Sequence, residues 1–379
     1  MDLSPTAMSS SDPTTPFDHP PAGRTSSGRE RTIGLDVARA VALIGVVVMN
    51  YHGMMNFRGP DAPPDDLLNR IFDIRTGVLT TRFAATFVVI AGISAVFLTS
   101  SDRPHGARLV RRGLFLLAVG YFVNEAWPGT ILFYYGAYFV CAAVLYRLRS
   151  RHLAALAAVA TAAAVGVATW RRQRELDGFS TAWMNPAEID SLRDFFFRVV
   201  IGYTHPLCPW LAFFCIGMIM GRNWSRLTSR PGPLAVAALG AVAMSYGLAT
   251  AVRDRRDDAL MNVLTAMDPN SRGLLYVVST AGIAVLAVLV LNRLAETFRG
   301  SRMVRPLQRA GQMTLSLYLG HILFYYAVVE WFGWFTATGL GAALLVAVGY
   351  WILAIAAAAW WHHRLGRGPA ERIYRWLGG

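Results

Sequence analysis

The chain has 379 residues, of which 54% are hydrophobic and only 16% are charged. The apolar residues fall in runs of about 20, the length that one helix needs to cross a bilayer core, so the composition excludes a soluble globular protein. The net charge is +13 and every basic residue is arginine, but the arginines lie between the apolar runs and not on one soluble face, which argues against nucleic-acid binding.

The chain divides into three parts by composition. Residues 1–30 are rich in Ser, Thr and Pro and lack the apolar core of a cleavable signal, which predicts a disordered cytosolic tail. Residues 31–363 form the membrane domain, and residues 364–379 form a basic cytosolic C-terminal segment. The apolar runs predict an all-α bundle of about ten transmembrane helices, with spans near 33–54, 80–100, 108–126, 129–148, 152–170, 203–222, 232–252, 272–292, 309–329 and 338–361.

Loop charges predict the orientation of this bundle. Arginines are concentrated after spans two, four, six, eight and ten, as expected of cytoplasmic loops. The alternate connections either contain no arginine, as at 125–130 and 331–337, or balance arginine with acidic residues. We therefore predict a multi-pass protein of the cytoplasmic membrane with both termini in the cytosol.

The first predicted span carries polar groups at two depths. Asp36 and Arg39 share one face near the inner surface, where an ion pair at the helix start is the plainer interpretation. Asn50, Tyr51 and His52 emerge near the outer surface, ~20 Å away at 1.5 Å per residue. An imidazole is suited to take a proton from a hydroxyl or amine, or to accept an acyl group itself. We predict His52 as catalytic, with Asn50 orienting it or binding an oxyanion, against the alternative of a hydrated helix end.

The ninth predicted span carries a polar stripe at positions i, i+4, i+7 and i+11, formed by Thr314, Tyr318, His321 and Tyr325. In contact with lipid these groups would lack hydrogen-bond partners, so this face should point into the bundle. We predict His321 as catalytic and Tyr318 as substrate-binding. A structural hydrogen-bond network between helices is an equal alternative.

Two residues near the outer ends of other spans are candidate substrate-binding groups. His205 stands before Pro206 and Pro209, which lack amide hydrogens and leave nearby carbonyls free. We expect it in the same outer pocket as His52, although a plain interfacial histidine is the simpler reading. Glu125 ends the third span, where a hydrated loop end is the plainer interpretation.

Four arginines are candidates for binding an anionic acyl donor that enters from the cytosol: Arg39, Arg82, Arg111 and Arg112. Arginine matches phosphate through its bidentate fork. The bias of cytoplasmic loops toward arginine would also produce most of them. Phosphate-binding glycine loops and Cys/His metal spacings are absent from the sequence, so no metal is expected.

Four sequence stretches together resemble a known family. In chain order they read RTIGLDVARAVALIGVVVMNY, RFAATFVVIAGISAVFLT, LVRRGLFLLAVG and GQMTLSLYLGHILF. Their order and their Leu-Asp-x-x-Arg, Asn-Tyr and Leu-Tyr-x-Gly-His marks resemble the heparan-alpha-glucosaminide N-acetyltransferase-like transmembrane acyltransferases and their bacterial relatives. The resemblance covers most of the chain past residue 30.

This resemblance implies transfer of an acyl group, most simply acetyl, from cytosolic acyl-CoA to a sugar or another hydroxyl or amine acceptor at the outer face. The implied partners are the acyl donor, a glycan or lipid-linked acceptor of the cell envelope, and membrane lipids, and a homodimer is compatible with it. By position, Asn50, Tyr51 and His321 match the family pattern, which adds Tyr51 to the substrate-binding candidates. The chain departs from the animal enzymes, whose catalytic histidine lies in a His-x-x-Trp setting in the first outer loop. That loop here reads MNFRGPDAPPDDLLNRIFDIRTG and has no histidine, which leaves His52 as the nearest substitute.

Two other functions compete with acyl transfer. A transporter or exporter of a small metabolite or lipid would use the stripe of the ninth span to line a substrate path. Transporters usually have broken spans at corresponding places in two halves, and the sequence shows no such pair. A membrane scaffold would explain the hydropathy but would leave Asn50, His52 and His321 without a role.

Overall fold

The computed structural model describes residues 26–58, 66–99, 105–186, 188–252, 258–335 and 339–378. These residues form helices joined by short loops, and no strand occurs among them. The predicted all-α class is therefore confirmed. Most of the predicted N-terminal tail, residues 1–25, lies outside the described residues.

Each predicted span coincides with a helix. The helices are α1 (Ser26–Arg58), α3 (Arg82–Leu98), α4 (Gly106–Ala126), α5 (Ile131–Leu145), α6 (Ser150–Leu176), α8 (Leu207–Arg222), α10 (Gly232–Ala251), α12 (Leu274–Thr297), α14 (Thr314–Tyr325) and α15 (Leu340–Leu365). A π-helix, η3 (Tyr326–Trp331), extends α14. The shorter helices are α2 (Leu67–Phe72), η1 (Ala182–Met184), α7 (Leu192–Val200), α9 (Trp224–Ser229), α11 (Ala259–Thr265), α13 (Val304–Gly311) and α16 (Pro369–Gly378).

Several of these helices are long and apolar enough to cross a bilayer. Within the described ranges, α1, α6, α10, α12 and α15 meet this condition. The pair formed by α13 and α14 with η3, bent by 87°, makes a sixth span if its two pieces are counted together. Helices α3, α5 and α8 are apolar but shorter. The chain is thus a polytopic membrane protein, and the number of ten crossings stays a prediction.

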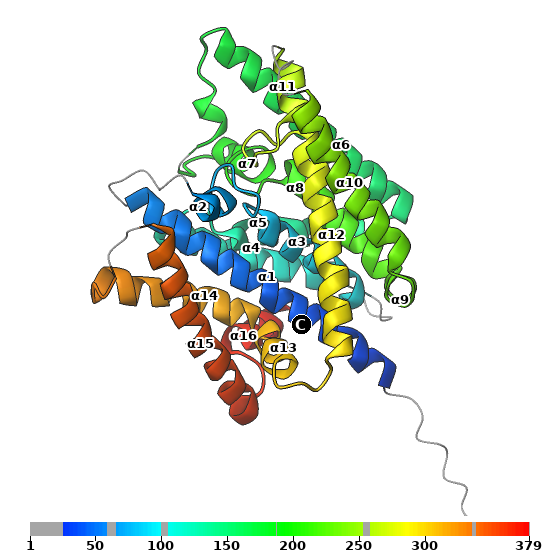
Figure 1. Ribbon diagram of the computed structural model, residues 1–379, viewed down its shortest axis with the longest axis vertical. Coiled ribbons are helices and arrows are strands. Elements are labelled where there is room, and N and C mark those ends of the chain that lie inside the picture. The colour runs from blue at the N-terminus through cyan, green and yellow to red at the C-terminus, as the bar shows by residue number, and fades with distance from the viewer. Residues whose placement is uncertain are drawn as a thin grey trace, which may run out of the picture.

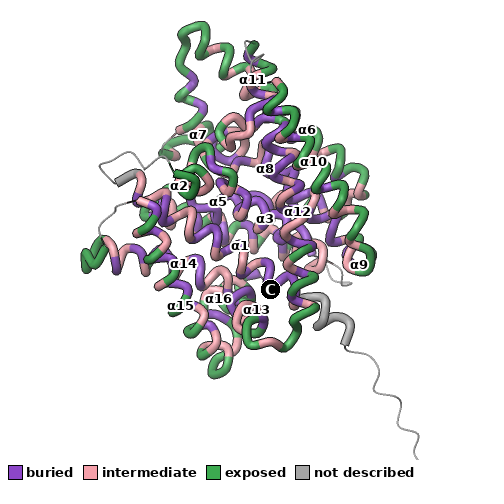
Figure 2. Tube along the Cα trace, viewed as in Figure 1, coloured by how far each residue is buried: buried purple, intermediate pink, exposed green. Residues whose placement is uncertain are grey.

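The buried centre of the bundle is formed by α1, α3, α5, α8 and α12, whereas α6 and α10 lie at its edge (Figures 1 and 2). The apolar window of α1 is 61% buried and that of α10 only 17%. An edge helix can expose apolar side chains because lipid tails are as apolar as the side chains themselves. In the centre, glycine permits close contact: a Cβ on Gly92 would lie 2.2 Å from the carbonyl oxygen of Phe214, so α3 packs directly on the backbone of α8.

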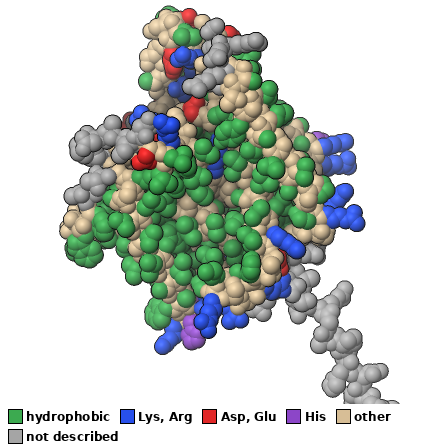
Figure 3. All heavy atoms as spheres, viewed as in Figure 1, with side chains coloured by type: hydrophobic (Ala, Val, Ile, Leu, Met, Phe, Trp, Pro, Cys, Tyr) green, Lys and Arg blue, Asp and Glu red, His purple; other side chains and the backbone are tan. Residues whose placement is uncertain are grey.

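Charged side chains gather at the ends of the bundle. Figure 3 shows a broad hydrophobic face, with arginines along its right and lower margins and acidic side chains mainly at the upper end. In the same orientation, α13 and α16 lie at the lower end and α11 lies at the upper end (Figure 1). The apolar face between two polar ends is the pattern expected of a protein embedded in a bilayer.

Candidate functional site

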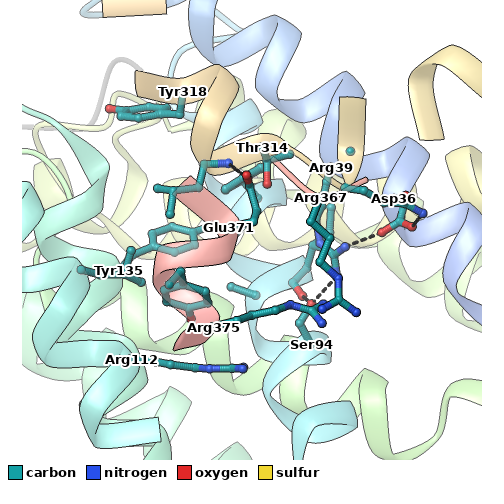
Figure 4. Close-up of a pocket in the computed structure, with 18 of the residues that line it drawn as sticks. Asp36, Arg39, Ser94, Arg112, Tyr135, Thr314, Tyr318, Arg367, Glu371 and Arg375 are labelled. Atoms are coloured by element: carbon teal, nitrogen blue, oxygen red, sulfur yellow. Dashed lines mark hydrogen bonds and ion pairs between the residues drawn. The ribbon is translucent and has the colours of Figure 1, made fainter. Parts of the chain in front are cut away.

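A cavity of about 680 Å³ lies among α1, α3, α4, α5, α14 and α16. We call it the basic cavity, because four arginines stand in its wall: Arg39, Arg112, Arg367 and Arg375. The rest of the wall is mainly apolar and aromatic, including Phe87, Ile90, Phe97, Leu116, Phe139, Tyr135, Tyr318 and Tyr374. Figure 4 shows the guanidinium groups on one side of the cavity and Tyr318 at the other.

The arginine side of the basic cavity is organised around Arg39. Its guanidinium contacts the Asp36 carboxylate at 2.5 Å and donates a hydrogen bond to the Ser94 hydroxyl at 2.7 Å. These contacts link α1 to α3 and fix one cationic group at the cavity wall. The expected ion pair at the start of the first span is therefore present, and the same arginine also faces the cavity.

The chain breaks between α13 and α14 beside this ion pair. A Cβ on Gly311 would lie 1.8 Å from the Asp36 carbonyl oxygen, so only glycine allows α13 to pack this closely on α1. Next to it, the Gln312 amide donates to the Asp36 carboxylate at 3.0 Å, and its oxygen lies 3.1 Å from Nε2 of His362. The break is thus held by polar contacts to α1 and α15.

The first turn of α14 is capped by a residue from the C-terminal helix. The Glu371 carboxylate of α16 accepts the backbone amides of Leu315 at 2.7 Å and Ser316 at 3.1 Å. Helix N-termini leave amide groups without intrahelical partners and favour negative charge. This cap fixes α16 against α14, and α16 completes the wall of the basic cavity.

Two buried donors in this wall lack a partner among the described residues. They are the Tyr135 hydroxyl and Nε of Arg112. Burying a polar group without a hydrogen bond is costly, and such groups are commonly satisfied by a ligand or water. Both donors therefore point to a polar ligand in the basic cavity.

At the end of the cavity opposite the arginines, Tyr318 lies beside a catalytic candidate. Its hydroxyl is 3.0 Å from Oγ1 of Thr130 and accepts the amide of Ile131 at 3.3 Å. One turn further along α14, the ring of His321 packs at 4.7 Å from the ring of Tyr318. The predicted inward face of this span is confirmed, because Tyr318, His321 and Tyr325 are buried and Thr314 is half-buried and lines the basic cavity.

His321 is paired with Asn50 across the helix interface. Its Nε2 lies 3.2 Å from the Asn50 amide nitrogen, and its Nδ1 contacts the carbonyl oxygen of Tyr318. A carbonyl oxygen can only accept, so Nδ1 carries the proton and Nε2 keeps a lone pair. The imidazole is therefore fixed as the tautomer whose Nε2 can act as a base.

Aromatic rings enclose this imidazole. The rings of Tyr51 and Trp127 lie 5.8 Å and 5.3 Å from it, and the Tyr51 hydroxyl donates to the His321 carbonyl at 2.8 Å. Tyr51, predicted from its position to bind substrate, thus fixes α1 against α14 in this structure.

The structure separates His52 from Asn50, so Asn50 does not orient His52 as one of its two predicted roles required, and donation to an oxyanion stays a prediction. Residues two apart on a helix do not face each other. The Nε2 atom of His52 instead lies 3.2 Å from the amide nitrogen of Asn56, and His52 does not line the basic cavity. Asn50 joins His321, and a catalytic role for His52 stays a prediction.

Of the four arginines predicted to bind the donor, two line the basic cavity and two do not. Arg39 and Arg112 are in its wall, whereas Arg111 is exposed. Arg82 is buried at the opposite end of α3 from Ser94, where it donates to Thr280. Arg82 therefore lies apart from Arg39 and Arg112, because α3 begins at this residue and contributes to the cavity wall from Phe87 to Leu98.

The two outer candidates also lie away from the basic cavity. His205 packs against Trp210 and Tyr134, with ring distances of 4.4 Å and 5.7 Å. Glu125 is exposed at the end of α4, and its neighbour Asn124 makes the buried contact by accepting a hydrogen bond from Arg198 at 2.8 Å. Their roles in substrate binding stay predictions.

The sequence reading missed the contribution of the C-terminal segment. Arg367, Glu371, Tyr374 and Arg375 all line the basic cavity, although the segment reads only as a basic tail. Pro369 at the first position of α16, followed by Glu371 in the first turn, is a helix-start signal that could have identified the element. Its packing against α4, where the ring of Tyr374 lies 6.0 Å from that of Phe115, is a tertiary contact with no local signal.

Two family models match the chain. A family model described as "Heparan-alpha-glucosaminide N-acetyltransferase, catalytic" matches residues 31–246, more than half of the chain. A second, described as "Protein of unknown function (DUF418)", matches residues 233–378 and so contains α14 and α16. No curated protein matches the chain. In the described residues, no group of three or more His, Cys, Asp or Glu side chains is arranged to hold a metal.

Proposed function

Because the chain belongs to the heparan-alpha-glucosaminide N-acetyltransferase catalytic family, we propose that it transfers an acyl group, most simply acetyl, from acyl-CoA bound in the basic cavity to an acceptor across the membrane. Family membership supports a membrane acetyltransferase-like function. The identity of the donor and of the acceptor, and the side of the membrane from which each one binds, are part of the proposal.

The main support for the proposal is the arrangement of charged and apolar side chains in the wall of the basic cavity. Four arginines at one side suit the phosphates of a coenzyme A thioester, since guanidinium groups bind phosphate by paired hydrogen bonds. The apolar and aromatic wall then leads to Tyr318, one turn from His321. Its volume of about 680 Å³ lies in the range of ~300–1,000 Å³ typical of small-molecule sites.

The chemistry follows from the protonation of His321. Its Nε2 takes the proton of the acceptor hydroxyl or amine as the acceptor atom attacks the thioester carbonyl carbon. The tetrahedral intermediate then collapses, the carbon–sulfur bond breaks, and Nε2 returns the proton to the leaving thiolate. Asn50, whose amide nitrogen lies 3.2 Å from Nε2, holds the ring before the reaction and can donate to the oxyanion once the ring is protonated.

The orientation is proposed from charge. The basic cavity has its arginines at the end of the bundle formed by α16 and by the start of α4, next to the connections that are rich in arginine. This end faces the cytosol in the predicted topology, where acyl-CoA is found. The acceptor, a glycan or lipid-linked group of the envelope, then reaches His321 from the opposite side.

The proposal is tested with the full-length protein in detergent or nanodiscs and acetyl-CoA labelled with ¹⁴C in the acetyl group. We expect labelled acceptor when a panel of amino sugars and polyprenyl-linked sugars is supplied, together with release of free CoA. An absence of both acceptor labelling and CoA binding would refute the proposal.

The break between α13 and α14 also gives a reason to test transport. Discontinuous helices form substrate sites in many transporters, and this pair is bent by 87°. Uptake of a labelled metabolite into protein-containing liposomes without acetyl-CoA would favour the transporter. We expect no such uptake, because contacts from the side chains of Glu371, Asp36 and His362 fix the segment between α13 and α14 in place.

A further inference from the structure

A second, small cavity lies at the end of the bundle opposite the basic cavity. Its volume is about 180 Å³, and its wall comes from the C-terminal part of α6, from α11 and from the loop before α12. Figure 1 shows α11 at the upper end of the molecule and α16 near the lower end. We call it the small cavity; its polar wall includes Arg171, Arg172, Arg272, Glu175, Asn262 and Asn270.

Arg272 is a half-buried cation in the wall of this cavity. Its guanidinium donates to the backbone carbonyls of Ile201 and Tyr203, which fix the side chain but carry no net charge. Burial and the neighbouring charge of Arg171 lower the pKa of Arg272 to about 10, so the side chain remains protonated at neutral pH. A fixed cation close to a second cation leaves a local excess of positive charge.

The nearby carboxylates do not contact these arginines directly. The Thr181 hydroxyl donates to Glu175 at 2.8 Å and accepts from Nε of Arg171 at 3.4 Å, so it lies between these two charged groups. Asp268 accepts the backbone amides of Asn270 and Ser271 at 3.1 Å and 2.9 Å. In the part of the chain that the structure describes, neither carboxylate forms an ion pair with Arg171 or Arg272. Three arginines therefore share the wall of the small cavity with one acidic side chain.

We propose that the small cavity binds the oxyanion of a small ligand, a phosphate or a carboxylate group, between Arg171 and Arg272. The amides of Asn262 and Asn270 in the same wall supply neutral donors for the remaining oxygens. The volume is below the ~300–1,000 Å³ of a drug-sized site, so the cavity fits an anionic group with a few attached atoms and not a whole cofactor. This inference does not depend on the proposed acyl transfer.

The test uses the full-length protein in phosphatidylcholine nanodiscs and follows thermal unfolding by tryptophan fluorescence. Inorganic phosphate is titrated at constant ionic strength against chloride. A ligand that binds only the folded state raises the unfolding midpoint in a saturable way. We expect Arg171→Gln to weaken this phosphate effect by roughly tenfold or more, because a charge-assisted hydrogen bond is lost.

Two further variants make the test specific. Arg174→Gln removes the same charge from the same helix, but Arg174 stacks over Phe179 at 4.3 Å and does not line the small cavity, so the phosphate effect should remain. Asn262→Asp places a carboxylate in the wall with little change of shape. We expect it to raise the unfolding midpoint without phosphate and to abolish the phosphate effect.

Phosphatidylglycerol nanodiscs distinguish a lipid headgroup from a free anion. If the lipid phosphate is the natural ligand, these discs should stabilise the wild-type protein but not Arg171→Gln, and added phosphate should have little further effect. If the ligand is a free anion, the phosphate effect should be the same in both lipids. The proposal is overturned if neither phosphate nor phosphatidylglycerol stabilises the wild-type protein more than Arg171→Gln.

Discussion

Two buried histidines near the same end of α1 and α14 allow a matched test of the catalytic assignment. His321 and His52 are 0% and 1% exposed, and in each the Nε2 atom lies 3.2 Å from the side-chain nitrogen of an asparagine. His321→Gln and His52→Gln therefore each remove a buried imidazole that contacts an asparagine amide, although in the described residues only His321 also has an Nδ1 partner, the Tyr318 carbonyl. Neither histidine lines the basic cavity itself, but His321 packs against Tyr318, which does.

We expect the two substitutions to differ in their effect on activity but to have similar effects on folding stability. Loss of a general base typically costs ~10²–10⁴-fold in rate, which corresponds to about 2.7–5.4 kcal/mol at 1.36 kcal/mol per tenfold. Leaving a buried asparagine amide without its partner costs ~1–3 kcal/mol of folding stability, and glutamine recovers part of it. We expect His321→Gln to lose activity at this scale, with the KM for acetyl-CoA nearly unchanged, and His52→Gln to keep most of its activity.

The assay is steady-state release of CoA from acetyl-CoA with a fixed acceptor, accompanied by thermal unfolding of each variant in the same detergent. Similar unfolding midpoints would show that both variants fold. If His52→Gln were inactive and His321→Gln were active, the assignment of the base to His321 would be refuted, and the role predicted for His52 from the sequence would gain support.

Other substitutions have expected outcomes of their own. Tyr135→Phe removes a buried hydroxyl that has no partner among the described residues. Folding stability should therefore be unchanged or higher, while the KM for acetyl-CoA should rise. A fall in stability without a change in KM would contradict this expectation. Arg112→Gln should raise that KM by roughly tenfold or more, whereas Arg111→Gln, adjacent but exposed, should not, as measured by initial rates. Burial alone would raise the pKa of Asp73, but hydrogen bonds from Thr76 to its carboxylate lower this pKa overall. The carboxylate should therefore contribute its full stabilisation above about pH 4 and lose it as the pH falls further. Asp73→Asn should make the unfolding midpoint less dependent on pH below about pH 4, and an unchanged dependence would argue against this role.

The positions of the helices could be predicted from the sequence because the signal is local. Long apolar runs mark a span wherever they occur, and each run corresponds to a helix here. The break at Gly311 and the cap from Glu371 were not predicted, since both depend on contacts between residues far apart in the chain. Only half of the arginines of the basic cavity were predicted, for the same reason. Arg39 and Arg112 were recognised as basic residues at the starts of predicted spans, whereas Arg367 and Arg375 enter the site through the packing of α16.

The catalytic residues show what helix periodicity can and cannot decide. The inward face of α14 followed from the spacing of Tyr318, His321 and Tyr325, and all three are buried. The partner of Asn50 did not follow, because its neighbour in sequence, His52, lies on another face of α1 while His321 comes from a different helix. Polar residues two apart on a predicted helix should therefore be treated as members of different sites.

A cryo-EM map of the full-length protein in nanodiscs with a non-hydrolysable acetyl-CoA analogue tests the central claim most directly. We predict density in the basic cavity, with the coenzyme phosphates at Arg39, Arg112, Arg367 and Arg375 and the acetyl carbonyl near Tyr318 and His321. Analogue density at any other site, with the basic cavity empty at saturating concentration, would contradict the assignment.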